Sequence, residues 1–265
     1  LKSCRDSSIP IVNTTLTAIG LCVRSGAVPA RNHSQAGPGR LLGLANQMPD
    51  YEALRQTMVD TQLRTNKVTD AKVLAAMGSV PREMFVPEDR ASFAYIDEDI
   101  RIGKSRCLVE PMVLARMIQA AEIGPEDVVL DVACGAGYSS AVLGHIARAV
   151  VAVESDTELA GAAGGRITKL GLDNVVIEIG QVNAGWADQE PYDVIMVNGA
   201  CEKMSDAILA QLGEGGRLCA VIADKSETGV ATLFVKSGGI VSSRVLFDAN
   251  VPGLPEFDLE EGFTF

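Results

Sequence analysis

Histidine, tryptophan and closely spaced cysteines are scarce in this sequence. Its 265 residues include two histidines, His33 and His145, and one tryptophan, and none of its six cysteines forms a Cys-x-x-Cys pair. Zinc sites depend on clustered cysteine and histidine ligands, so the sequence predicts no metal site. Cysteines in apolar surroundings, such as Cys219 between Leu218 and Ala220, indicate reduced and buried thiols. We therefore expect a cytoplasmic protein.

Long apolar runs and an excess of basic residues are also absent. No segment is long and apolar enough to span a bilayer, so the sequence predicts no membrane partner. The net charge is −11, and residues 48–265 carry 18 basic and 33 acidic side chains, a net charge of −15. Because an acidic surface repels a phosphate backbone, we expect no nucleic-acid partner. With 47% apolar and 22% charged residues, the chain can bury a large core.

Residues 1–47 differ in composition from the rest of the chain. They are rich in Ser, Thr, Asn, Gly and Pro, and they carry five basic residues against one acid. A secretory signal is one interpretation, because an apolar stretch at 9–23 precedes small residues at 27–30, but polar side chains interrupt that stretch. We favour a disordered or non-native extension, with the folded protein starting at Met48.

Residues 48–265 alternate between strand and helix patterns. Short apolar runs predict strands, and longer amphipathic segments predict helices. This alternation is typical of an α/β protein with a doubly wound, mostly parallel sheet, and β-rich runs on both sides of Gly238-Gly239 add an antiparallel edge hairpin. The predicted strands are 127–133, 149–154, 174–179, 192–198, 216–223, 230–237 and 241–248, and the predicted helices between them are 138–147, 156–170 and 204–211.

A helical region precedes this core. Capping residues and prolines mark its elements. We expect helices at 51–65 (capped by Asp50), at 70–77 (capped by Thr69 and ended by Gly78) and at 111–121, with an extended segment at 81–87 and an irregular one at 95–109. The sequence thus predicts a single domain over 48–265, in which 48–110 form an N-terminal, substrate-side region and 111–265 form the cofactor-binding core.

The segment after the first predicted strand of the core has the features of a nucleoside-cofactor site. Asp131 lies near the end of that strand, Gly135-Ala-Gly137 form a turn into the next helix, and Glu154 ends the second strand. Glycines let a ligand approach the backbone, and an acid at this strand end can accept both ribose hydroxyls. A dinucleotide fingerprint needs a third glycine where this chain has Ser140, so the pattern favours S-adenosylmethionine over NAD. An ordinary strand-to-helix turn is the alternative.

Further residues along the same edge are candidates for contact with that cofactor. Ala133, Cys134 and Ala136 complete the turn, and Tyr138 either packs beside the methionine chain or simply begins its helix. Gln181 could hydrogen-bond the adenine edge, with a solvated loop residue as the alternative, and Val182 could pack on the ring. Asn198 faces the same crevice, although we favour a turn-forming role for it before Gly199.

Several separate segments carry a resemblance to a known family. They include Met58-Val-Asp-x-Gln62-Leu63, Val80-Pro-Arg-Glu-x-Phe85-Val-Pro87, Asp131-Val-x-x-Gly135-x-Gly137-Tyr138, Pro191-Tyr-Asp193-x-Ile195 and Leu212-x-x-Gly215-Gly216-Arg217-Leu218. In this order they resemble the protein-L-isoaspartate O-methyltransferases over about residues 51–223. The resemblance implies a Rossmann-like methyltransferase that uses S-adenosyl-L-methionine. Its substrates would be isoaspartyl-containing proteins or peptides, and methylation of the free carboxylate would serve protein repair.

The segment 105–111 departs from the family pattern. Where the family has Gly-Gln-Thr-Ile-Ser-Gln-Pro, this chain has Ser-Arg-Cys-Leu-Val-Glu-Pro. The resemblance places Cys107 and Val109 at the catalytic Thr and Ser positions, and Arg106 and Glu110 beside the substrate. Arg106 could grip a carboxylate, pair with Glu110 or be a plain surface charge. Gln181 likewise stands where the family has an acid that is associated with adenine.

A carboxylate acceptor needs little chemical help from the protein. It is already ionised near neutral pH, so no general base is required, and the protein supplies alignment and a dry pocket. With Val109 and Glu110 in the acceptor segment, we expect weakened isoaspartyl activity or a changed acceptor. The alternatives are a methyltransferase for another acceptor, a cofactor-binding protein with little turnover and, more remotely, a dehydrogenase.

Overall fold

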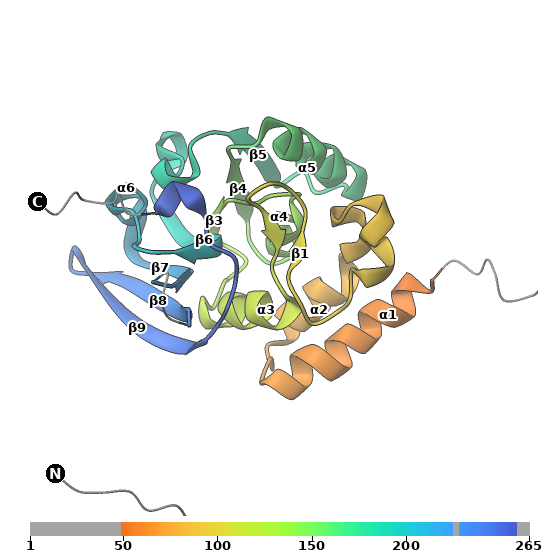
Figure 1. Cartoon of the computed structure of the whole chain (residues 1–265). Coiled ribbons are helices and arrows are strands. Elements are labelled where there is room, and N and C mark those ends of the chain that lie inside the picture. The colour runs from red at the N-terminus through yellow and green to blue at the C-terminus, as the bar shows by residue number, and fades with distance from the viewer. Residues whose placement is uncertain (1–48, 225–227, 259–265) are drawn as a thin grey trace, which may run out of the picture. The chain divides into compact units, whose positions relative to one another are not determined.

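The computed structural model describes residues 49–224 and 228–258, and it places helices on both faces of a central sheet (Figure 1). Within those ranges the sheet has seven strands in the order β5-β4-β3-β6-β7-β8-β9. Strands β3 to β7 pair in parallel, whereas the β7–β8 and β8–β9 pairs are antiparallel. Their bounds are β3 Val128–Val132, β4 Ala149–Glu154, β5 Val175–Ile179, β6 Tyr192–Cys201, β7 Leu212–Ile222, β8 Val230–Ser237 and β9 Ile240–Asp248. The predicted α/β fold with its edge hairpin is confirmed.

Alternate residues of the strands supply two core clusters on opposite faces of the sheet. In β3, Val129 belongs to one cluster, while Leu130 and Val132 belong to the other. This follows from the two-residue period of a strand. The first cluster is completed by α2, α3 and α4, and the second by α6 and a C-terminal segment. The helices are α1 Tyr51–Met58, α2 Ala71–Ser79, α3 Pro111–Ala120, α4 Tyr138–Gly144, α5 Thr157–Leu170 and α6 Asp206–Ala210.

The strand order determines where a ligand crevice lies. Strand β3 pairs with β4 on one side and with β6 on the other. The chain continues from β3 to β4 and from β6 to β7, so the connections that leave β3 and β6 turn in opposite directions along the sheet. In open parallel sheets such a switch point opens a crevice outside the carboxyl ends of the strands. The loop after Val132 and the acid Glu154 both lie at that edge.

Residues 81–87 correct the sequence prediction. The extended conformation is found at the residues that precede proline, Val80 and Val86, which have ψ angles of 121° and 161°. Between them, residues 82–85 form a 3-10 turn, because Arg82 and Phe85 turn inward and are fully buried. The prediction of an extended segment here is therefore wrong.

Other predicted bounds shift by a few residues. Helix α2 is capped by Asp70, whose side chain accepts a hydrogen bond from the backbone N–H of Lys72, rather than by Thr69. The predicted helix at 51–65 continues beyond α1 as a π-helical turn and then a 3-10 turn. The irregular segment 95–109 contains a two-stranded ribbon, β1 Ile100–Arg101 and β2 Cys107–Leu108. The predicted boundary at Met48 lies outside the described residues, so the domain division stays a prediction.

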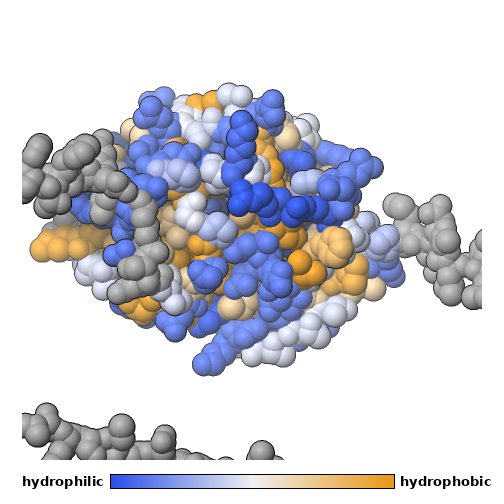
Figure 2. All heavy atoms as spheres, viewed as in Figure 1, coloured by the Kyte–Doolittle hydropathy of each residue, from blue (hydrophilic) through white to orange (hydrophobic). Residues whose placement is uncertain are grey.

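The surface is mainly polar on the face that Figure 2 shows, with apolar side chains in scattered patches. Within the described ranges, none of the helices combines the length and apolar character needed to cross a membrane. Over the same residues, no group of three or more His, Cys, Asp or Glu side chains is arranged to hold a metal ion.

Candidate functional site

The loop between β3 and α4 leaves no room for side chains at its two glycines. Gly135 and Gly137 have positive φ angles of 56° and 92°, a conformation that costs glycine little. A Cβ on Gly135 would lie 2.8 Å from Cδ1 of Ile102, and one on Gly137 would lie 3.0 Å from Cβ of Ala163. Ala133 adopts the same left-handed region, with φ of 55°. The predicted glycine turn is therefore a tight one that larger residues would strain.

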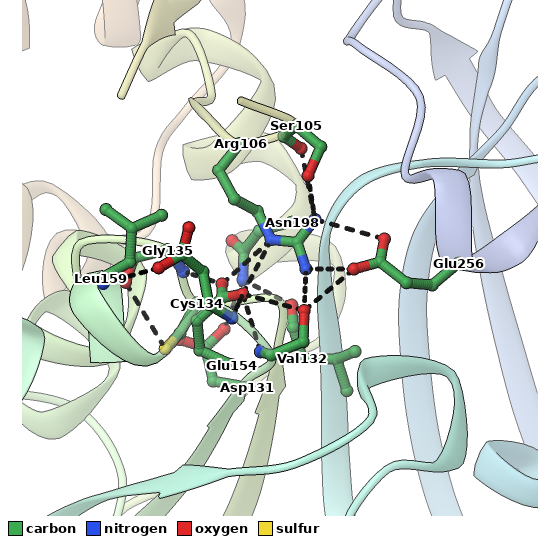
Figure 3. A network of polar contacts seen from close by, with 12 residues as sticks. Ser105, Arg106, Asp131, Val132, Cys134, Gly135, Glu154, Leu159, Asn198 and Glu256 are labelled. Carbon is green, nitrogen blue, oxygen red and sulfur yellow. Dashed lines mark hydrogen bonds and ion pairs between the residues drawn. The ribbon is translucent and has the colours of Figure 1, made fainter. Parts of the chain in front are cut away.

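Asp131, in β3, supports the residues that follow this loop with a fully buried carboxylate. Its Oδ2 accepts hydrogen bonds from the hydroxyls of Ser139 (2.7 Å) and Ser140 (2.6 Å). Its Oδ1 accepts one from Nδ2 of Asn198 at 2.7 Å (Figure 3). Burial raises the pKa of Asp131, and the three donors act in the opposite direction. The carboxylate thus ties the first turn of α4 to β6.

Two of these donors have roles that differ from the sequence interpretation. The interpretation of Asn198 as a turn-forming residue is wrong, because β6 continues through Cys201 and Asn198 is buried within it. Its Nδ2 also donates to the carbonyl of Val132 at 3.0 Å. Ser140, which the sequence shows only as a missing glycine, contributes a hydroxyl that Asp131 needs.

Glu154 lies against the same loop from the neighbouring strand β4, and it is fully buried. Its Oε2 accepts a hydrogen bond from the backbone N–H of Gly135 at 2.8 Å. Its Oε1 accepts from the backbone N–H groups of Ser155 (2.8 Å) and Asp156 (3.0 Å). The structure therefore brings the two predicted acids, Asp131 and Glu154, into contact with the same segment, from the glycine turn to the first turn of α4.

Arg106 is a cation inside this site, only 2% exposed (Figure 3). Its Nε lies 3.0 Å from both carboxylate oxygens of Glu154, and its Nη2 lies 2.6 Å from Oε1 of Glu256. Burial lowers the pKa of Arg106, but hydrogen bonds to Glu256 and Glu154 outweigh burial and leave the pKa raised. The interpretation of Arg106 as a surface charge is therefore wrong. Its acidic partners are these two carboxylates and not Glu110.

The segment predicted to face the acceptor lies beside the cofactor loop. Cys107 and Val109 line a cavity of about 10 Å³ together with Cys134, Tyr138 and Asn198. A space of this size holds about one water molecule. The structure therefore brings the predicted acceptor positions and the predicted cofactor turn to the same small cavity.

Acidic side chains surround that segment. The carboxylate of Asp99 accepts a hydrogen bond from the backbone N–H of Glu110 at 2.8 Å. Burial raises the pKa of Glu110, and the charges of Asp99 and Asp97 raise it further. Burial also raises the pKa of the Cys107 thiol, assisted by Asp99. The thiol is therefore neutral near pH 7, next to an edge that carries negative charge.

The remaining predicted cofactor residues differ in exposure. Tyr138 begins α4 and is fully buried, with its ring 4.7 Å from the Arg82 guanidinium and in edge contact with Phe85 at a centroid distance of 5.5 Å. Gln181 is exposed after β5, and Val182 is fully buried in the second core cluster. Contacts of these side chains with a ligand stay predictions.

Sequence reasoning missed two residues of this site. Arg82 donates from Nε to the carbonyl of Ala94 (2.7 Å) and from Nη2 to the carbonyl of Val109 (2.8 Å), so it holds the acceptor segment in place. Its position within the Val-Pro-Arg-Glu motif is a signal that could have identified it. Glu256 lies 150 positions from its partner Arg106, and no local pattern marks it.

The sequence model of one family matches most of the described core. It is the model named "Protein-L-isoaspartate(D-aspartate) O-methyltransferase (PCMT)", and it matches residues 54–250. The chain is 41% identical over 182 residues to a protein-L-isoaspartate O-methyltransferase of Methylorubrum extorquens, which covers 68% of this chain and 79% of the relative. It is also 41% identical over 164 residues to that of Koribacter versatilis, covering 62% of this chain and 74% of the relative.

Solved structures give the same fold. A protein-L-isoaspartate O-methyltransferase structure superposes with a TM-score of 0.67 at 24% identity, covering 76% of this chain and 65% of that one. A Plasmodium falciparum protein described as a protein-L-isoaspartate O-methyltransferase, solved with S-adenosyl-L-homocysteine, superposes with a TM-score of 0.65 at 19% identity. That match covers 79% of this chain and all of the other. Together with the family match over residues 54–250, these comparisons confirm the predicted family: the chain belongs to the protein-L-isoaspartate(D-aspartate) O-methyltransferases.

Proposed function

We propose that this protein uses S-adenosyl-L-methionine to methylate the free carboxylate of isoaspartyl residues in damaged proteins. The match of the family model to residues 54–250 is the observation that carries the proposal. The dehydrogenase alternative loses its support, because Ser140 is committed to Asp131 and the chain belongs to a methyltransferase family.

The residues at the switch point fit such a cofactor. The turn at 133–137 has glycines at positive φ where a Cβ would collide with Ile102 or Ala163, so its tight shape depends on glycine. In this proposal Glu154, at the end of β4, accepts hydrogen bonds from the ribose hydroxyls, and Gln181 and Val182, which follow β5, contact the adenine. Asp131 acts through Ser139 and Ser140 by shaping the turn. When bound, the cofactor supplies an electrophilic methyl group.

The acceptor segment performs alignment rather than proton transfer. An isoaspartyl carboxylate is ionised near pH 7 and attacks without a base. Cys107 offers it a neutral thiol, which is a weak hydrogen-bond donor, and the side chain of Val109 offers no donor. The raised pKa of Glu110 reduces its charge only when the pH falls toward that pKa. We therefore infer weaker isoaspartyl turnover than a hydroxyl-lined segment would give.

A methyl-transfer assay tests the proposal. The protein is incubated with labelled S-adenosyl-L-methionine and with matched peptides that contain either isoaspartyl or normal aspartyl residues. Labelling of the isoaspartyl peptide alone supports repair methylation. Labelling of neither peptide, with binding of S-adenosyl-L-homocysteine retained in calorimetry, contradicts isoaspartyl transfer.

A second candidate function is methylation of another acceptor, and one observation favours it. Asp97, Asp99 and Glu110 place several carboxylates around the acceptor segment, which disfavours an anionic acceptor and favours a neutral or cationic one. A panel of neutral and cationic acceptors in the same assay distinguishes the two. Transfer to one of them at rates above the isoaspartyl peptide would replace the first proposal.

A further inference from the structure

Glu154, the acid proposed to face the ribose, has its acceptor capacity filled by the protein itself. Three backbone N–H groups, from Gly135, Ser155 and Asp156, donate to its two oxygens at 2.8 to 3.0 Å. A carboxylate offers about four acceptor positions. The Nε of Arg106 lies 3.0 Å from both oxygens of Glu154 and faces the remaining acceptor position. Ribose hydroxyls and Arg106 therefore require the same lone pairs.

The rest of the Arg106 guanidinium is held just as firmly. Its Nη1 lies 3.2 Å from the carbonyl of Ser105 and 3.2 Å from Oε2 of Glu256. Its Nη2 donates to Oγ of Ser155 (2.9 Å) and to Oε1 of Glu256 (2.6 Å). The Arg106 side chain is 2% exposed and its partner Glu256 is partly exposed, so the guanidinium end of these bonds is shielded from solvent.

Glu256 reaches this position from the C-terminal segment. Leu254 and Phe257 on either side of it are buried in the second core cluster, and Nδ2 of Asn183 donates to its backbone carbonyl at 2.9 Å. Asn183 follows Val182, a residue predicted to contact adenine. The guanidinium of Arg106 thus connects the segment at 105–106, Glu154 and the C-terminal segment.

We propose that Arg106 is a positioning residue that sets cofactor affinity by competing with the ribose hydroxyls for Glu154. It moves off that carboxylate when the hydroxyls bind and keeps Glu256 as its acidic partner, so its charge is not left unpaired inside the protein. This inference rests on the proposed role of Glu154 in cofactor binding.

Replacement of Arg106 by glutamine removes the competing charge and the Nε donor and leaves a shorter polar side chain. We expect R106Q to bind S-adenosyl-L-homocysteine about tenfold more tightly than the unaltered protein in isothermal calorimetry. Arg101→Gln is the matched control, because Arg101 is exposed on β1 and its Nη1 donates to the carbonyl of Lys104. R101Q should leave the affinity unchanged. Equal or weaker binding by a folded R106Q would overturn the proposal.

A measurement on the unaltered protein does not depend on how well the variant folds. The Nε–H signal of Arg106 in a nitrogen-15 NMR spectrum is assigned by its through-bond connections to the backbone of Arg106. Addition of S-adenosyl-L-homocysteine should shift that signal and reduce its protection from hydrogen exchange, and an unchanged signal contradicts release.

A third variant, Glu154→Gln, separates the two roles. Unchanged affinity in E154Q would show that the ribose assignment itself is wrong and would end the competition argument. None of these readouts involves an acceptor peptide, so failure of the isoaspartyl assignment would leave them unaltered.

Discussion

Substitution of Ser140 by alanine removes one of the three donors to the fully buried carboxylate of Asp131. Hydrogen bonds to charged groups contribute about 1.5–3 kcal/mol, whereas neutral ones contribute about 0.5–1.5 kcal/mol. The alanine leaves Ser139 and Asn198 in place, so the protein should still fold. We expect the free energy of unfolding at pH 7 to fall by about 1.5–3 kcal/mol.

The effect should depend on pH in a defined direction. Burial raises the pKa of Asp131 in the folded protein above its usual value of 3.8. An acid with a raised pKa lowers stability as the pH rises between the unfolded and folded pKa values, because the unfolded chain then binds fewer protons. Loss of the Ser140 donor raises the folded pKa further. The destabilisation by S140A should therefore be smallest in acid and grow toward neutral pH.

Urea unfolding at a series of pH values measures this difference. Ser243→Ala, at an exposed position in β9, is the control and should change stability by less than about 0.5 kcal/mol. A destabilisation by S140A below about 0.5 kcal/mol at pH 7, or one that does not vary with pH, would refute the argument that this hydroxyl supports an ionised Asp131.

Three other predictions concern the acceptor segment, the glycine turn and the thiols. Val109→Ser should raise kcat/KM for an isoaspartyl peptide about 5- to 150-fold, since a paired hydroxyl contributes about 1–3 kcal/mol; no gain would count against the lost-donor account. Gly137→Ala should lower affinity for S-adenosyl-L-homocysteine and should lower the free energy of unfolding by about 1–3 kcal/mol. The reason is that Gly137 has a φ of 92° and that a Cβ there would lie 3.0 Å from Cβ of Ala163 in α5. Its control is Gly161→Ala within α5, where a Cβ meets nothing within 4 Å; this substitution should stabilise the helix by about 1 kcal/mol. Equal effects of the two variants would show that the turn is not strained. In iodoacetamide labelling followed by mass spectrometry, half-buried Cys107 should react well before Cys219, since burial raises the pKa of Cys219 to about 12. The reverse order would mean that the core opens more readily than the edge of the site.

The fold could be predicted well from local patterns because strand and helix periodicity belong to neighbouring residues. The glycine turn at 135–137 and the acids at 131 and 154 were accessible in the same way, since each lies at a predicted strand end. The conformation of 82–85 was not, because the prolines restrict only the residues before them, Val80 and Val86, and inward packing of Arg82 and Phe85 decided the turn between them. Hydrophobic burial of a side chain can outweigh a local backbone preference.

The sequence by itself determined the order of elements along the chain, the family motifs and the strand ends that carry the site residues, all of which depend on spacing along the chain. Only the tertiary structure decided what Asn198 and Arg106 contact. Asn198 meets Asp131 across 67 positions, and Arg106 meets Glu154 across 48 and Glu256 across 150. Such contacts are set by how strands and loops pack in space, and hydrogen-bonding groups in a buried site take whichever partners that packing brings within reach.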